Sequence, residues 1–578
     1  MKIGIDFGST YSTLSSYLPD ENRVVALKLD ATESEAIPSV VCVSKNGRVS
    51  CGFAAKVQVG RRNCRVFEAF KMLLNESDNA LLSNRGYDDK YSPREVSRLY
   101  LGSLLQRMLD NYAKNSSEHF EEIVVCVPEV WCNNVRTQDG RSILRDILLN
   151  EIKAPVDSVR VVTEPEAASA YLAYHYEKET GLPFNGHLLL IDYGGGTLDL
   201  TLTRVESFGN GNMETSFRAG GGAGENHDGS LGSAGVAYMQ TVVALAIKKN
   251  TSEENIDYTD PAFLGCVRDL ESQLKSSDRM KEIAEYFGSF GSGYEVLKSI
   301  SEEDDEEFIL LDFKDDELSI SYLDLLRAYM QTIEKTLNDE IIKINKEVQK
   351  RTGIDPCSPK TGTRDDFKIA LVGGFGSFYL VKKQLGDIYN LDFNEKLDKR
   401  TKNVNAEGKE LAISYGAALM AAGVVAKKRV ARFSIGLYTA SHDGVYRPNY
   451  AIRYLQEVEP ETTYYILRDK EKGDVPGNRM VFGALYQNIK HFVINFTDDT
   501  DKGGLMALKQ AMIKKLERIP QEGYWYCGFS LDKNDIVVFH ASSARIGGHS
   551  ENHMQIDIPL DNYSGMFELT AIKEVSTK

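Results

Sequence analysis

The feature that most constrains how this chain folds is an internal repeat. Residues 3–10 read Ile-Gly-Ile-Asp-Phe-Gly-Ser-Thr, and residues 189–197 read Leu-Leu-Ile-Asp-Tyr-Gly-Gly-Gly-Thr. In each copy an apolar strand ends in Asp, an aromatic residue and Gly, and a second strand starts at Tyr11 or at Leu198. The repeat therefore predicts two β-hairpins, one in each half of a duplicated unit.

The tips of both hairpins have the composition of a phosphate site. Glycine permits positive φ and leaves no side chain between the backbone N–H groups and an anion. Hydroxyl groups add donors, and carboxylates of both copies would hold a magnesium ion through its waters. The tip residues are Gly8, Ser9, Thr10, Gly194, Gly195, Gly196 and Thr197, and the carboxylates are Asp6, Asp192 and Asp199. Either tip alone fits an ordinary tight turn equally well, but the matched pair favours a polyphosphate site.

Two further patterns support this reading. Residues 164–171 and 410–418 both predict helices built from small residues, which could cross closely and act as a hinge, although each alone fits ordinary core packing. The strand at residues 369–372 is followed by Gly373 and Gly374, then by a helix from about Tyr379. This order is typical of many nucleotide sites, and the sequence contains no G-x-x-x-x-G-K-[ST] loop.

Taken in order, these segments resemble the ATPase domain of the seventy-kilodalton heat-shock chaperones, within the actin, sugar-kinase and heat-shock superfamily. Smaller landmarks agree at residues 37–41, 52–56, 66–71 and 123–128. The resemblance covers about residues 1–428 and implies an α/β, duplicated actin-like ATPase fold. Its lobes would span residues 1–186 and 187–428, and a smaller β-rich C-terminal domain would span residues 429–578.

The resemblance also implies ATP or ADP with Mg²⁺ as the ligand, and a role for each matching residue. Ser9, Thr10 and Tyr11 would hold phosphates, and Lys71 would neutralise the γ-phosphate and position the attacking water. The groups expected around the magnesium ion, the attacking water and the γ-phosphate are Glu164, Asp192, Asp199 and Thr197. The groups expected beside the adenosine are Gly373, Gly374 and Glu410. Without the resemblance, Lys71 would be interpreted as an exposed helix lysine.

The sequence departs from the family pattern on the adenosine side. After the two glycines the family usually carries a serine and then an arginine that flanks the adenine, whereas Phe375 and Ser377 stand at those places here. Gly232 keeps only part of a Leu-Gly-Gly turn that contacts phosphate in the family. Residues 270–283, with Lys275 and Lys281, are the candidate for the adenosine-binding helix.

The last 150 residues predict a β-rich domain without the long helical lid of the family. Strands are expected at residues 431–437, 463–467, 491–496, 524–531 and 535–539. A single amphipathic helix is expected at residues 505–519, with Leu505, Leu508, Met512 and Leu516 on one face. We expect this domain to bind a peptide or protein segment.

Composition limits the remaining function classes. The formal charge of −16 disfavours a nucleic-acid partner, and no apolar run is long enough to predict a membrane span. The acidic residue at position 6 disfavours a secretory leader, so a cytoplasmic protein with reduced cysteines is expected. The leading hypothesis is a chaperone-like ATPase with a co-chaperone or nucleotide-exchange partner. The alternatives are a catalytically weakened scaffold, a small-molecule kinase and a filament-forming actin relative.

Overall fold

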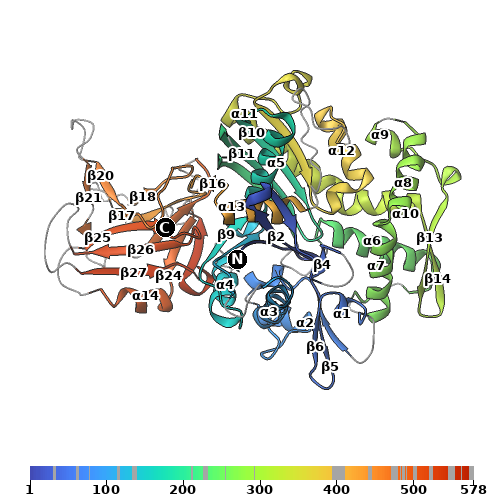
Figure 1. The fold of residues 1–578 in the computed structure, drawn as a ribbon, viewed down its shortest axis with the longest axis horizontal. Helices are drawn as coiled ribbons and strands as arrows, with labels where there is room; N and C mark the ends of the chain where they lie inside the picture. The colour runs from blue at the N-terminus through green and yellow to red at the C-terminus, as the bar shows by residue number, and fades with distance from the viewer. Residues whose placement is uncertain are drawn as a thin grey trace. The chain divides into compact units, whose positions relative to one another are not determined.

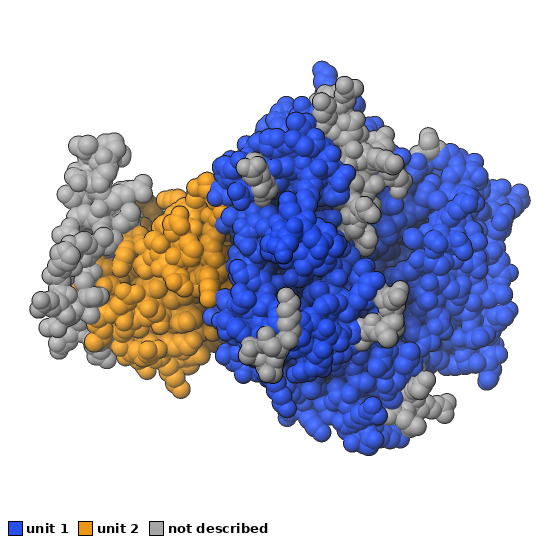
Figure 2. Space-filling model, viewed as in Figure 1, with its two compact units in different colours: residues 1–73, 78–130, 145–427 blue, residues 74–77, 131–144, 428–578 orange. Residues whose placement is uncertain are grey.

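The computed structural model divides the chain into two compact units (Figure 2). Unit 1 comprises residues 1–73, 78–130 and 145–427, and unit 2 comprises residues 74–77, 131–144 and 428–578. The domain limits at residues 186 and 428 stay predictions. The described residues are 1–29, 34–59, 64–76, 78–113, 118–132, 140–209, 212–224, 232–253, 255–258, 260–291, 293–393, 411–440, 446–469, 479–481, 483–484, 489, 491–498, 504–519, 525–543, 554–561 and 563–571.

The first sheet of unit 1 holds the first hairpin. Its strand order is β3-β2-β1-β8-β9, with β4 paired to β2. β1 runs antiparallel to β2 and parallel to β8. The alternate apolar residues Ile3, Ile5 and Phe7 of β1 are buried, which fixes its register against both neighbours. The strands are β1 Lys2–Phe7, β2 Tyr11–Leu18, β3 Arg23–Ala26, β4 Ile37–Pro38, β8 Glu122–Val127 and β9 Val159–Thr163.

The second sheet of unit 1 repeats this arrangement around the second hairpin. Its order is β15-β10-β11-β12-β16, and β10 is antiparallel to β11 and parallel to β15. Its strands are β10 Gly186–Tyr193, β11 Leu198–Gly209, β12 Asn212–Ala223, β15 Phe367–Val372 and β16 Val425–Lys427. The predicted α/β fold with a duplicated hairpin is therefore confirmed.

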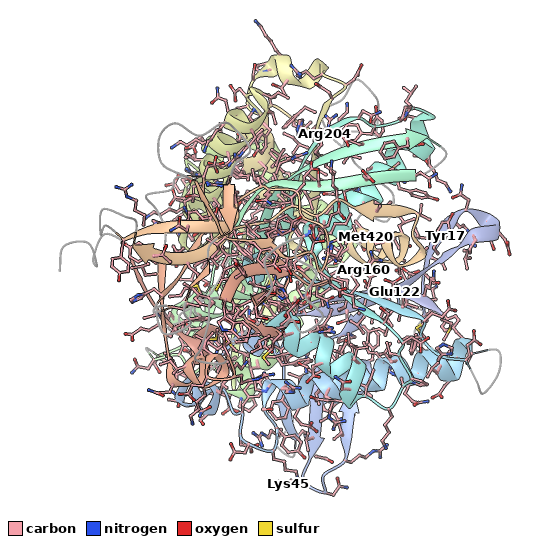
Figure 3. All side chains as sticks on the ribbon, turned by 90° about the vertical axis from the view of Figure 1, so that its left-hand side faces the viewer. Tyr17, Lys45, Glu122, Arg160, Arg204 and Met420 are labelled. Atoms are coloured by element: carbon pink, nitrogen blue, oxygen red, sulfur yellow. The ribbon has the colours of Figure 1, made fainter. Side chains whose placement is uncertain are left out.

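Two helices of small residues cross at the centre of unit 1, α5 (Glu164–Thr180) and α13 (Ala412–Ala422) (Figure 1). A Cβ at Gly416 would overlap the carbonyl group of Ala167, so only glycine permits this approach of the two backbones. Figure 3 labels a further tie at the end of α13: Arg160 on β9 lies 3.0 Å from Glu122 and donates to the carbonyl oxygen of Met420 at 2.7 Å.

The remaining elements of unit 1 flank these sheets. A buried aromatic core that includes Tyr238, Phe287 and Tyr329 holds the helices of its second half together. The short strands are β5 Val41–Ser44, β6 Val49–Cys51, β7 Cys64–Phe67, β13 Glu307–Phe313 and β14 Asp316–Ser321. The helices are α1 Phe53–Lys56, α2 Asn79–Asn84, α3 Pro93–Tyr112, α6 Gly235–Asn250, α7 Pro261–Leu274, α8 Ser277–Ser289, α9 Tyr294–Leu297, α10 Tyr322–Tyr329, α11 Lys335–Thr352 and α12 Tyr379–Tyr389. Helix α4 Gly140–Asp146 has residues in both units.

Unit 2 is built from two main antiparallel sheets, of order β18-β17-β23-β24-β28 and β19-β25-β26-β27. Phe492, Phe529 and Phe539 belong to the apolar core of this unit. Its elements are β17 Ser434–Ala440, β18 Tyr446–Ile452, β19 Tyr464–Tyr465, β20 Leu467–Asp469, β21 Arg479–Val481, β22 Gly483–Ala484, β23 His491–Asn495, β24 Gly504–Leu508, α14 Gln510–Leu516, β25 Trp525–Leu531, β26 Val537–Ser542, β27 Gln555–Pro559, α15 Tyr563–Met566 and β28 Phe567–Ala571.

The C-terminal helix was predicted too long. Residues 505–508 lie in β24, which pairs with β23 and β28, and α14 covers only Gln510–Leu516. Strand pairing on both sides outweighed the helical spacing of Leu505 and Leu508. Over the described parts of both units, no helix combines the length and the hydrophobicity that crossing a bilayer requires.

Candidate functional site

The tips of the two hairpins meet in unit 1. The turn from Gly194 to Thr197 is closed by a hydrogen bond from Gly194 N to Thr197 O of 2.9 Å. A Cβ at Gly195 would clash with the Thr10 hydroxyl, and one at Gly196 would stand 3.0 Å from Ser9 Oγ. The missing side chains therefore leave room for the hydroxyl groups of the opposite tip.

Below the tips, the structure gathers four carboxyl groups around one lysine. Asp6 lies near the end of β1. Asp192 on β10 and Asp199 on β11 are paired directly opposite each other. Glu164 begins α5 and forms an ion pair with Lys71, whose side chain is only 2% exposed. The exposed-lysine interpretation of Lys71 is thus wrong, because its ammonium group is buried among carboxylates.

Burial and mutual repulsion shift the proton affinities of this cluster. Burial, and then the charge of Glu164, raise the pKa of Asp6 to about 7, although Lys71 opposes the shift. Burial raises the pKa of Asp192 well above its usual value, and Glu164, Asp199 and Asp6 raise it further. For Lys71, burial lowers the pKa, but Glu164 and Asp6 outweigh burial and leave it raised. The cluster therefore has too few positive charges for its carboxylates.

Several polar atoms in the cluster are satisfied only in part. Asp199 Oδ1 accepts a hydrogen bond from Glu129 N at 3.0 Å. Asp192 Oδ2 and Thr10 Oγ1 are buried without a hydrogen-bond partner within the described structure. Buried polar atoms that lack partners cost free energy. A cation that binds oxygen ligands would satisfy the carboxylate oxygen of Asp192, and an anion would accept a hydrogen bond from the Thr10 hydroxyl.

This arrangement suits a magnesium polyphosphate held partly through water. No group of three or more His, Cys, Asp and Glu side chains in the described ranges is close enough to ligate a metal directly. Magnesium usually keeps several waters and uses one or two carboxylates together with substrate phosphates. The excess of carboxylates fits the magnesium ion of such a ligand, and the two glycine tips fit its phosphates.

Comparison with known proteins finds similarity to one chaperone family. Residues 2–277 match the family model described as Hsp70 protein. This match supports the predicted similarity of these residues to the Hsp70 ATPase domain. The chaperone protein DnaK of Metamycoplasma hominis is 28% identical over 257 residues, which cover 44% of this chain and 37% of that protein. The DnaK of Nitrosopumilus maritimus is 23% identical over 428 residues, 73% of this chain and 56% of the relative.

A plastid relative matches over a shorter span. The stromal 70 kDa heat shock-related protein of Pisum sativum is 25% identical over 225 residues, 35% of this chain and 29% of the relative. The chain thus spans between about a third and a little over half of the length of these curated relatives.

The base end of the site differs from the Hsp70 pattern. Gly373 has a φ of +83°, and a Cβ there would meet the backbone of Tyr193 and the carboxyl group of Asp192. Phe375, which stands in place of the family serine, is buried against Tyr193 and Tyr238, with ring centroids 5.1 and 5.4 Å away. Ser377 Oγ donates to the carbonyl oxygen of Gly374 at 2.7 Å. Neither side chain offers a flat or charged face to a base.

Two other predicted site residues, one for phosphate and one for adenosine, are placed only in part. Gly232 lies between β12 and α6, and Glu410 lies outside the described residues. Lys275, at the end of α7, reaches the first hairpin, where its Nζ lies 4.0 Å from the centroid of the Tyr11 ring. Lys281 lies on α8, where its side chain is 76% exposed beside Glu285, and its role stays a prediction.

Sequence reasoning missed an ion-pair network near Lys275. Glu271 lies 2.7 Å from Lys275 and 3.4 Å from Lys56, and Lys56 lies 4.0 Å from Glu68. This network joins the small sheet that contains β7 to helix α7, beside the Tyr11 tip. The only available signal was that Lys56 and Glu68 fall in two of the family landmarks.

Proposed function

We propose that unit 1 binds ATP with magnesium between its two hairpins and hydrolyses it. The observation that carries the proposal is the buried pair of Lys71 and Glu164, which stands with three further carboxyl groups beneath two facing glycine tips. A buried charge cluster is costly to fold, and active sites are where such groups concentrate. The Hsp70 match over residues 2–277 supports the same function.

Each residue has a defined task in this proposal. Backbone N–H groups of both tips, with the hydroxyls of Ser9, Thr10 and Thr197, hold the phosphates in line. Asp6, Asp192 and Asp199 would hold a magnesium ion through its waters, and magnesium would supply charge neutralisation for the phosphate oxygens.

Lys71 faces the phosphoryl group being transferred, and Glu164 fixes its ammonium group by their ion pair. Glu164 and Asp192 orient the water that attacks phosphorus while the bond to ADP breaks. Phosphoryl transfer depends mainly on such positioning and charge compensation.

We further propose that nucleotide state controls binding of a peptide or protein segment by unit 2. Helix α5 starts at Glu164, and two residues later Glu166 accepts from the Thr163 N–H and lies 3.2 Å from Lys427. Lys427 ends β16, which extends the second sheet parallel to β12 and immediately precedes unit 2. A shift of Lys71 and Glu164 would therefore be transmitted to β16 through the first turn of α5 and the ion pair of Glu166 with Lys427.

The test is phosphate release by the full chain, measured with unfolded peptides and without them. Hydrolysis that needs Mg²⁺ and responds to peptide supports both parts. Phosphate release that does not respond to peptide would contradict coupling between nucleotide state and peptide binding. Nucleotide binding without hydrolysis would favour the alternative of a catalytically weakened scaffold. Limited proteolysis near residues 426–432 provides an independent readout. Cleavage should differ between ATP and ADP, and identical digestion at saturating nucleotide would contradict the switch.

A further inference from the structure

Unit 2 contains a hydrogen-bonded chain of three side chains that the ATPase proposal does not use. Ser530 Oγ lies 2.7 Å from His540 Nε2, and His540 Nδ1 lies 2.6 Å from Asp557 Oδ1. The three residues come from the adjacent strands β25, β26 and β27. His540 stands directly opposite Asp557, and Ser530 lies diagonally from His540 because Gly528 is the direct neighbour of His540.

The direction of the hydrogen bonds follows from the charge of Asp557. Burial raises the pKa of this carboxyl group, but hydrogen bonds from Gln555 and His540 outweigh burial and leave the pKa lowered. An ionised carboxylate only accepts, so His540 Nδ1 donates to Asp557, and in the neutral imidazole Nε2 then accepts the hydroxyl proton of Ser530. This is the tautomer that a general base needs to activate a serine.

The strand scaffold holds this arrangement firmly. Alternate residues of β25 and β26, including Phe529 and Phe539, face the apolar core, so Ser530 and His540 lie on the other face of the sheet. Ser530 is 3% exposed and His540 is 6% exposed, whereas the side chain of Asp557 is 52% exposed. This low exposure limits access to the serine to a small acyl group and to single water molecules.

We propose that Ser530, His540 and Asp557 form a catalytic site for hydrolysis of small carboxylic esters. Ser530 Oγ attacks the carbonyl carbon while its proton moves to His540 Nε2. The ester C–O bond then breaks, and the alcohol leaves with that proton. Water, deprotonated in turn by His540, cleaves the acyl-serine, so ester and water give acid and alcohol without a further reactant. Asp557 is a positioning residue that fixes the imidazole.

Labelling of the full chain with a small fluorophosphonate tests the proposal directly. The reagent forms a phosphorus–oxygen bond to an activated serine and loses fluoride, and peptide mapping locates the adduct. The expected result is an adduct at Ser530 that is absent from Ser530→Ala. Ser542→Ala is the matched control, since Ser542 lies on the same strand and face as His540, is 4% exposed, and should leave the adduct in place.

The other two residues separate catalysis from structural support. His540→Ala should slow labelling by about a hundredfold or more, which is the usual contribution of a general base. Asp557→Asn changes an exposed side chain, so it should slow labelling and release of nitrophenol from p-nitrophenyl acetate while thermal unfolding stays nearly unchanged. An unlabelled Ser530 in the folded wild type, or equal labelling rates in wild type and Asp557→Asn, would overturn the site and leave the three residues as a tie between strands.

Discussion

The phosphate end and the base end of the candidate site in unit 1 use their buried residues in opposite ways. At the phosphate end, Lys71, Glu164 and three aspartates are held close together, and Asp192 Oδ2 is left without a hydrogen-bond partner among the described atoms. At the base end, Phe375 packs into the aromatic core and Ser377 bonds to its own turn.

The difference separates residues that serve a ligand from residues that serve the fold. Uncompensated buried charge destabilises a protein, so the phosphate end is arranged for a bound group that supplies the missing partners. Aromatic packing stabilises the fold whether or not a ligand is present. We therefore expect substitutions at the phosphate end to change nucleotide binding and hydrolysis far more than substitutions at the base end.

Gly195→Val should give the largest effect. The side chain would occupy the space of the Thr10 hydroxyl and separate the two tips. ATP affinity, measured by calorimetry, should fall by at least about a hundredfold, or 2.7 kcal/mol. Gly265→Val is the matched control, because a Cβ at Gly265 on α7 meets nothing within 4 Å. Normal ATP binding by the Gly195 variant would show that the tips do not enclose the phosphates.

Lys71→Ala should act on turnover rather than on ADP binding. The lysine is assigned to the phosphoryl group in transfer, so hydrolysis should fall by at least about tenfold, or 1.4 kcal/mol of barrier. ADP affinity should change little, which also checks that the variant is folded despite the unpaired Glu164. Lys45→Ala, at the exposed turn after β5 (Figure 3), is the control. Equal turnover in Lys71→Ala and wild type would remove Lys71 from the mechanism.

Nucleotide binding should depend on pH because Asp6 has a pKa of about 7. Below that pH the free protein carries a neutral Asp6, which must lose its proton before it can face a hydrated cation. The affinity for magnesium nucleotide should therefore fall as pH drops through 7, by up to about tenfold per pH unit. Calorimetry in buffers of different ionisation enthalpy should detect proton release at pH 6.

Asp6→Asn should remove about one released proton per nucleotide bound. The exposed Asp20→Asn should retain the wild-type value, because its carboxyl group is distant from the cluster in sequence and lies on the surface. Proton release that is identical in wild type and Asp6→Asn would show that Asp6 stays neutral when nucleotide binds.

The contrast between the two ends also explains what the sequence could predict. The hairpin tips were predictable because their glycines and aspartates are contiguous, and the duplicated pattern fixes which strand ends carry them. The ion-pair network of Lys56 and Glu271 was not predictable, because these residues are 215 positions apart and charged residues on helices usually form solvated faces. Only folding brings α1 and α7 together.

Two other cases show different limits of local patterns. Local sequence alone favoured an exposed helix lysine at position 71, and only the family resemblance assigned Lys71 to the γ-phosphate, because burial of a charge depends on partners from β1 and α5 that no local pattern shows. Residues 505–508 were predicted as helix because Leu505 and Leu508 fit a helical spacing, but strand neighbours on both sides decided otherwise. Short apolar segments are commonly ambiguous in this way.

The smallest effect should come from Ser377, which tests the base end directly. Its hydroxyl already bonds to Gly374 O, so Ser377→Ala should change the Kd values of ATP and GTP by less than about threefold, or 0.7 kcal/mol. The wild type should prefer ATP over GTP by less than about a hundredfold, because no arginine stands at this position to flank the base. Ser377→Arg should raise that preference while phosphate contacts stay intact. A wild-type preference above a hundredfold would mean that another group reads the base, and Lys275, held over the Tyr11 ring, would be the first residue to substitute.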